Sequence, residues 1–122
     1  MADRRRSTGA KGEKVARAYL EKKGYRILEA NFRCPEGEID LVAQKGDCLV
    51  LVEVRTRTGR AFGTPEESIT TAKKQKLLVL SQVYRQGRKG LPAQGRIDVV
   101  AVELGAEGQV QRLEHIENAV SY

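Results

Sequence analysis

The chain has 122 residues, of which 40% are hydrophobic and 31% are charged. These proportions predict one folded domain with a single core and exclude a disordered chain. A total of 22 Lys and Arg against 16 Asp and Glu gives a net charge of +6, which favours a polyanionic partner such as nucleic acid. The apolar runs are too short to cross a membrane and no apolar signal segment is present at the N-terminus, so we expect a cytoplasmic protein with no membrane partner.

The first half of the chain predicts one helix and three strands. Residues 1–8 are expected to form a flexible basic tail, and a helix is predicted over about residues 11–23, ending at the glycine that follows. A strand over residues 25–33 should end before Pro35. Two further strands lie within residues 37–57, on either side of the turn sequence KGD.

A second helix and two strands complete the predicted elements. Thr64, Pro65 and Glu67 have the spacing of a cap, a first turn and a capping box, so a helix is predicted from there to Gly87. Residues 95–104 and 110–119 predict two strands, the second of them at a sheet edge. The order α-β-β-β-α-β-β predicts an α/β fold, with one mixed sheet flanked by helices in a single domain over residues 1–122.

The two strands within residues 37–57 are apolar, yet they carry Glu38, Asp40, Glu53 and Arg55. A turn at 45–46 would place Glu38 opposite Glu53, whereas a turn at 46–47 would place Asp40 there. Because side chains alternate along a strand, both registers predict that all four lie on one face, whereas a three-residue loop would place the two pairs on opposite faces. Two opposed carboxylates are destabilising unless a positive charge compensates them, and that charge is either a structural ion pair or a cation of the Mg²⁺ type.

Four stretches of the sequence carry a family resemblance: GEIDLVA, LVLVEVRTR, FGTPEESITTAKKQKL and RIDVVAV. They resemble the YraN-type family of small bacterial proteins, which is uncharacterised and described as endonuclease-like. The similarity extends from Gly9 to about Val102. It implies the restriction-endonuclease-like fold of the PD-(D/E)xK superfamily, in which one strand supplies an acid and the next an acid-x-Lys. The arrangement is also similar to that of archaeal Holliday-junction resolvases, which makes a homodimer an open expectation.

Carried over by residue, the resemblance implies a metal site and a set of catalytic side chains. Asp40 and Glu53 would bind Mg²⁺ or Mn²⁺, with the carbonyl of Val54 beside them. Glu13 matches the helical glutamate upstream of the strands. Arg55 stands where the signature has lysine, and arginine can stabilise charge on a phosphate but cannot readily transfer a proton.

Other residues are assigned to nucleic-acid contact or to support of the site. Lys73, Lys74 and Lys76 resemble the basic helix that some of these nucleases lay along DNA, although the solvated face of an amphipathic helix explains them as well. Arg57 is assigned to the same contact. Residues with a supporting role around the site or the sheet edge are Glu38, Gln75, Arg96 and Asp98.

Two functions of different classes follow from this pattern. The first is a divalent-metal-dependent nuclease that hydrolyses phosphodiester bonds of DNA, branched or single-stranded, with DNA expected over RNA. The alternative is a non-catalytic nucleic-acid-binding module that keeps the nuclease fold. His115 is the single histidine, so chemistry based on a histidine nucleophile or triad has little support, and we interpret this residue as structural.

Overall fold

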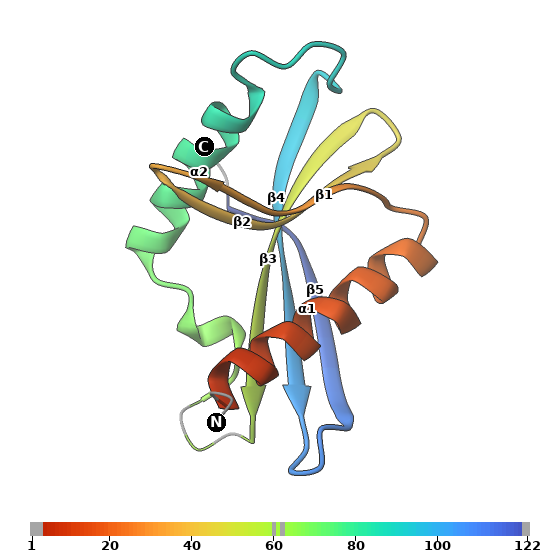
Figure 1. Cartoon of the computed structure of the whole chain (residues 1–122), viewed down its shortest axis with the longest axis vertical. Coiled ribbons are helices and arrows are strands. Elements are labelled where there is room, and N and C mark those ends of the chain that lie inside the picture. The colour runs from red at the N-terminus through yellow and green to blue at the C-terminus, as the bar shows by residue number, and fades with distance from the viewer. Residues whose placement is uncertain (1–3, 60, 62, 121–122) are drawn as a thin grey trace.

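The computed structural model describes residues 4–59, 61 and 63–120, in which five strands form one mixed sheet between two α-helices (Figure 1). The elements are α1 (Arg4–Lys22), β1 (Arg26–Cys34), β2 (Gly37–Lys45), β3 (Cys48–Thr58), the short 3₁₀ helix η1 (Glu66–Ser68), α2 (Thr71–Arg85), β4 (Gln94–Leu104) and β5 (Val110–Val120). This order confirms the predicted α/β class and is consistent with a restriction-endonuclease-like fold. Neither α-helix is long and apolar enough to span a membrane within these residues.

The strands lie in the order β1-β2-β3-β4-β5, with β3 and β4 parallel and the other pairs antiparallel. The chain therefore crosses from β3 to β4 through α2, as a parallel pair requires. Lys45 pairs with Cys48, so the β2–β3 turn consists of Gly46 and Asp47, and Gly46 takes the positive φ of 57° that such a turn needs. The structure thus selects one of the two predicted registers.

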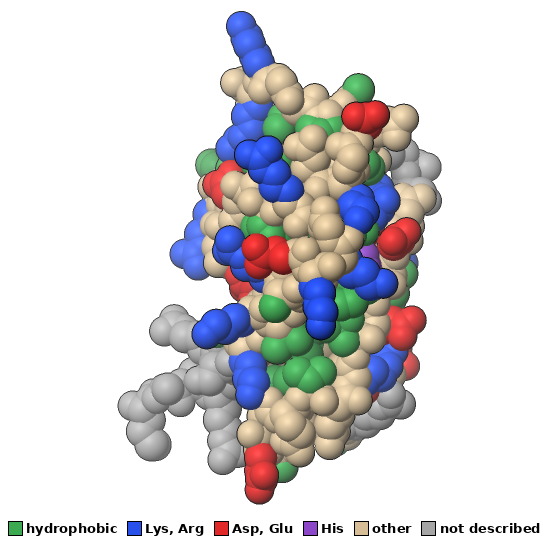
Figure 2. All heavy atoms as spheres, turned by 90° about the vertical axis from the view of Figure 1, so that its right-hand side faces the viewer, with side chains coloured by type: hydrophobic (Ala, Val, Ile, Leu, Met, Phe, Trp, Pro, Cys, Tyr) green, Lys and Arg blue, Asp and Glu red, His purple; other side chains and the backbone are tan. Residues whose placement is uncertain are grey.

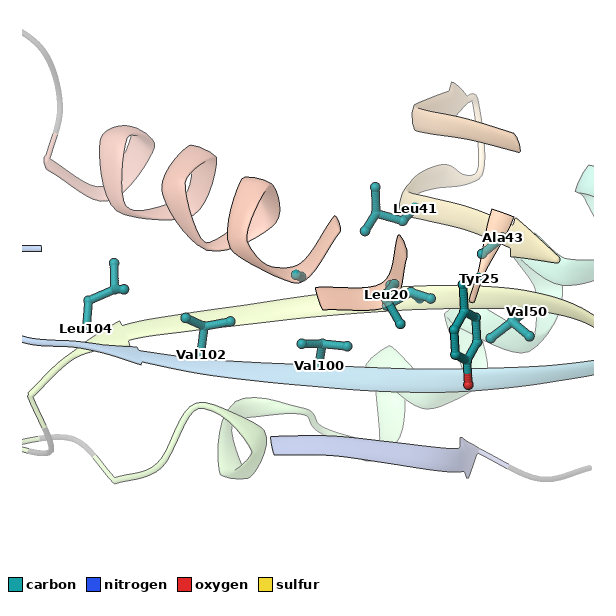
Figure 3. Close-up of a cluster of buried hydrophobic side chains, with 10 residues drawn as sticks. Leu20, Tyr25, Leu41, Ala43, Val50, Val100, Val102 and Leu104 are labelled. Carbon is teal, nitrogen blue, oxygen red and sulfur yellow. The ribbon is translucent and has the colours of Figure 1, made fainter. Parts of the chain in front are cut away.

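Each helix covers its own cluster of buried apolar side chains. Ala16 and Leu20 of α1 pack on Val50 and Val52 of β3 and on β4, in the cluster drawn in Figure 3. On the opposite face, α2 packs its own apolar stripe, which includes Leu77, on the sheet. The central strands are buried on both faces, and for that reason their sequences are continuous apolar runs.

Both helices begin elsewhere than predicted. The first starts at Arg4, so residues 4–8 of the expected tail are helical, and the remainder of that tail, residues 1–3, lies outside the described residues. The predicted cap at Thr64 is wrong, because η1 begins after Pro65 without a side-chain cap and ends after one turn, where the backbone becomes extended at Ile69. The cap of α2 is Thr70, whose hydroxyl oxygen accepts the amide of Lys73 at 3.1 Å.

A glycine sets how closely α1 approaches the sheet. A Cβ atom at Gly12 would lie 1.8 Å from Oγ1 and 2.7 Å from Cβ of Thr56 in β3, whereas a Cβ at Gly9, on the same helix, would meet nothing within 4 Å. Alanine is the better helix former by about 1 kcal/mol, so Gly9→Ala should stabilise the protein by about that amount. Gly12→Ala should instead destabilise it by about 1–3 kcal/mol through overpacking.

Chemical denaturation of both variants measures this difference, since they share the helix and the substitution and differ only in the approach to β3. A stabilised Gly12→Ala variant would contradict the packing described for α1.

Candidate active site

The candidate site lies where β2 and β3 stop pairing. Their ladder runs from Lys45 and Cys48 to Leu41 and Val52 and ends there, although both strands continue. The next residues of the two strands are Asp40 and Glu53. The backbone amide of Val54 donates to Oδ2 of Asp40 at 2.8 Å, so a side chain takes up the hydrogen bond at the point where the ladder ends.

The regular alternation of side chains breaks at this fork, the place where β2 and β3 separate beyond Leu41 and Val52. Asn31 of β1 has a positive φ of 56°, Ile39 packs in the α2 cluster, and Leu41, two residues later, packs in the α1 cluster. The predicted common face therefore does not extend to Glu38, because alternation fails between residues 39 and 41. Glu38 instead forms an ion pair with Arg33 of β1 at 3.6 Å.

Asp40 and Glu53 are brought together in a setting that disfavours two negative charges. The side chain of Glu53 is only 5% exposed, and the two carboxyl groups hydrogen-bond to each other. Burial, and then the neighbouring Glu53, raise the pKa of Asp40 from 3.8 to about 8. A proton on Asp40, or a metal ion beside it, would offset this negative charge.

Two cationic side chains converge on the same oxygen of Glu53. Nη2 of Arg55 lies 3.1 Å from Oε2, and Nζ of Lys73, from the first turn of α2, lies 3.2 Å from it. Nε of Arg55 is buried and makes no hydrogen bond within the described residues. Buried donors are nearly always satisfied in folded proteins, so this one is suited to an anionic oxygen from a ligand.

Glu13 of α1 approaches the fork from the opposite face. Burial raises its pKa, a hydrogen bond with the side chain of Asn31 opposes this rise, and Glu38 adds to it. The negative charge of Glu13 in turn contributes to the raised pKa of Asp40, so the two carboxylates interact electrostatically. An open groove of about 340 Å³ runs beside Glu13 between α1 and the β1–β2 hairpin, and Lys14 and Arg17 line it.

The basic residues assigned to α2 separate into two groups. Lys73 reaches Glu53, whereas Lys74, Gln75 and Lys76 are exposed to solvent. The supporting role assigned to Gln75 stays a prediction. Arg57 is half-buried on β3, two residues beyond Arg55.

Arg96 and Asp98 lie away from this site, in a buried network between β4, β5 and α1. Asp98 is fully buried and accepts hydrogen bonds from Nε of Arg96 at 2.9 Å and from the amide of Asn118 at 2.9 Å. Nε2 of His115 lies 2.8 Å from it, and Nδ1 of His115 lies 3.3 Å from the hydroxyl of Tyr19. His115 is 7% exposed, and only a small part of it reaches the surface in Figure 2. This placement accords with a structural histidine, and it puts Arg96 and Asp98 in a network on β4, an interior strand of the sheet, rather than at the fork.

The donor set at the fork suits a hard divalent cation. Among the described residues no group of three or more His, Cys, Asp or Glu side chains is close enough to hold a metal, so a zinc centre closed by protein ligands has no support there. Mg²⁺ needs only one or two carboxylates, because water and substrate phosphate complete its shell. Asp40 and Glu53 meet this requirement. A bound cation would offset the electrostatic repulsion between their carboxylates.

Sequence reasoning missed two features of this site. Asn31, the partner of Glu13, could have been noticed, because asparagine is rare in strands and is tolerated at positive φ. The ion pair between Lys73 and Glu53 could not have been predicted from the sequence, because it depends on a helix that begins at residue 71 rather than 65.

Comparison with known proteins places this architecture in a family. The model of the uncharacterised protein family UPF0102 matches residues 12–102. The chain belongs to the UPF0102 family. This confirms the YraN-type resemblance, and the match includes Glu13, Asp40, Glu53 and Lys73.

UPF0102 proteins of several bacteria are similar to the chain over nearly its whole length. The protein of Pelotomaculum thermopropionicum is 50% identical over 119 residues, covering 98% of this chain and 99% of the relative. That of Moorella thermoacetica is 47% identical over 120 residues, covering 98% and 99%. That of Geobacter metallireducens is 40% identical over 119 residues, covering 98% and 96%. Full-length similarity at this level indicates one shared fold.

Proposed function

We propose that this UPF0102 protein is a divalent-metal-dependent nuclease that hydrolyses phosphodiester bonds of DNA. The observation that carries the proposal is the contact of Asp40 and Glu53 at the fork, with the pKa of Asp40 raised to about 8. Perturbed acids beside fixed cations are typical of catalytic sites that bind phosphate and metal. The net charge of +6 favours a polyanionic substrate.

The side chains of the chain have separate roles in this reaction. Asp40 and Glu53, with the carbonyl of Val54 near them, would hold Mg²⁺ or Mn²⁺, which supplies positive charge and increases the acidity of a water molecule. Arg55 would bind a non-bridging phosphate oxygen through its free Nε. Water oxygen then bonds to phosphorus, the bond to the leaving oxygen breaks, and that oxygen takes up a proton as the water loses one.

The path of the substrate is suggested by the charges around the fork. Lys14 and Arg17 line the groove beside Glu13, and Lys74 and Lys76 are exposed on α2 at the other side. Backbone phosphates bound by such residues give affinity without sequence preference. On the face seen in Figure 2, basic side chains are mixed with acidic ones and form no single stripe. Contacts to backbone phosphates predict strongly salt-dependent binding.

A cleavage assay tests the proposal. The purified protein is incubated with single-stranded, duplex, flapped and four-way DNA and with RNA, each in Mg²⁺, Mn²⁺ or EDTA. We expect metal-dependent DNA cleavage that falls by at least about 100-fold in Asp40→Asn, because the carboxylate that binds the ion is lost. Asp47→Asn is the matched control, since Asp47 is exposed at the turn of the same hairpin.

The opposite result would support the alternative function. Equal nucleic-acid binding by wild type and Asp40→Asn, with no cleavage of any substrate in either metal, would indicate a binding module that keeps the fold. That module should still lose affinity steeply with salt.

A further inference from the structure

The lysine at residue 73 is held in a position unlike that of its neighbours. Its backbone amide donates to Oγ1 of Thr70, the N-cap of α2, which fixes the start of the helix. Its side chain is 30% exposed and reaches Glu53, whereas Lys74 and Lys76 point to solvent. A lysine that served only as part of a basic DNA-binding face would have no need of this contact.

Lys73 and Arg55 share Oε2 of Glu53 but differ in chemistry. The guanidinium of Arg55 is a planar, permanently charged group that suits a phosphate oxygen. The ammonium of Lys73 is a compact charge with three donors that rotate freely, so it can hold Glu53 and still direct a donor to a water molecule. The strand position that carries Arg55 therefore supplies charge, while the helix supplies a lysine to the same carboxylate.

We propose that Lys73 is the functional lysine of this site, a positioning residue that holds Glu53 and orients the attacking water. The inference rests on the proposed nuclease function. It assigns to α2 a role in the chemistry that is separate from DNA affinity. Arg55 then keeps the role of phosphate clamp, and the absence of lysine on β3 does not make the site inactive.

The inference predicts effects of opposite sign on metal binding and on cleavage. Removing the ammonium beside Glu53 takes one positive charge from the ion site, so Lys73→Ala should bind Mn²⁺ more tightly, by about fivefold. The same variant should lose cleavage by about 100-fold at saturating protein in single-turnover conditions, because water and Glu53 are no longer held. A residue needed only for folding would weaken both.

A second substitution can restore what the first removes. The side chain of residue 55 already reaches Oε2 of Glu53, so Arg55→Lys in the Lys73→Ala background places an ammonium beside the same oxygen. The change also removes Nε, the phosphate donor of Arg55, so the double variant should regain only part of the lost single-turnover rate, about tenfold. If Lys73 served only to contact a DNA phosphate, a lysine at residue 55 on β3 would not restore the cleavage rate.

The experiment measures three quantities for wild type, Lys73→Ala, Lys73→Gln, the double variant and Lys89→Ala. They are the single-turnover cleavage rate, the affinity for the same DNA in EDTA, and the affinity for Mn²⁺ from the free-ion electron paramagnetic resonance signal. Lys89 is an exposed lysine in the loop after α2 and serves as the control. Thermal melts identify variants that fail to fold, in which case Lys73→Gln replaces Lys73→Ala in the comparison.

The outcomes separate this inference from the function on which it rests. Tighter Mn²⁺ binding, slow cleavage, DNA affinity within about twofold of wild type and rescue by Arg55→Lys support it. Cleavage by Lys73→Ala at the wild-type rate, or a loss of rate matched by a loss of DNA affinity without rescue, overturns it and leaves the nuclease proposal intact. Absence of cleavage by wild type on every substrate overturns both.

Discussion

Asp40→Asn should raise the stability of the metal-free protein at pH 8 by about 1–3 kcal/mol, a rise of several degrees in melting temperature. The side chain of asparagine can accept a hydrogen bond from the backbone amide of Val54 and donate one to Glu53, as the protonated carboxyl group of Asp40 does. Unlike an ionised aspartate, it adds no negative charge beside Glu53. The full difference between the two pKa values would correspond to a larger free energy. We expect structural relaxation around Asp40 and Glu53 to reduce the measured gain in stability.

The pH dependence of this effect has a definite sign. The pKa of Asp40 is about 8 in the folded chain and 3.8 is its ordinary value, so between these values the folded state holds a proton that the unfolded state has lost. Stability from this group is therefore greatest below about pH 4 and declines as the pH rises towards 8. The asparagine variant lacks the decline, and the difference between the two proteins should grow from pH 5 to pH 8.

Thermal melts across this pH range, with and without Mn²⁺, test the prediction. Mn²⁺ should stabilise wild type by mass action and leave Asp40→Asn unchanged. Asp47→Asn, on the same hairpin, should show neither the rise nor its pH dependence. A variant less stable than wild type at pH 8 would show that the carboxylate pair is already compensated within the protein.

The largest loss of stability is expected for Asp98→Ala, at about 3–5 kcal/mol. The substitution leaves the guanidinium of Arg96 and the amide of Asn118 without their buried acceptor, and His115 without its partner. Asp98→Asn keeps an acceptor and should lose about half as much. Urea denaturation monitored by circular dichroism gives both values.

Glu117→Ala is the control for this network. Glu117 lies 3.8 Å from Arg96, but its side chain is 63% exposed, so its loss should change stability by less than about 0.5 kcal/mol. Equal losses for Asp98→Ala and Glu117→Ala would contradict the structural role assigned to the buried aspartate.

The fold was predictable because its elements carry local signals. The β-branched runs of β3 and β4, the glycine after α1 and the turn before β5 each mark an element in the sequence. The start of α2 was not predictable in this way, because Thr64, Pro65 and Glu67 satisfy the rules of a helix cap. The backbone nevertheless becomes extended at Ile69 and the helix begins only after Thr70, so the local cap signal is overridden by the path of the chain.

The site was predictable in part. Hairpin geometry alone restricted Glu53 to two partners, and only the structure chooses Asp40 over Glu38. Glu38 does not share the face of Asp40, because side-chain alternation breaks between Ile39 and Leu41, which a strictly alternating strand does not foresee. Contacts between elements far apart in the chain, such as Lys73 with Glu53, depend on packing and have no signature in sequence spacing.

Anomalous scattering from crystals grown with Mn²⁺ tests the central claim most directly, because it locates the ion independently of any activity. The account predicts a peak at the fork, within about 2.5 Å of an oxygen of Asp40 and of Glu53. Crystals in which the two carboxyl groups still hydrogen-bond to each other at saturating Mn²⁺, with no peak between them, would contradict it.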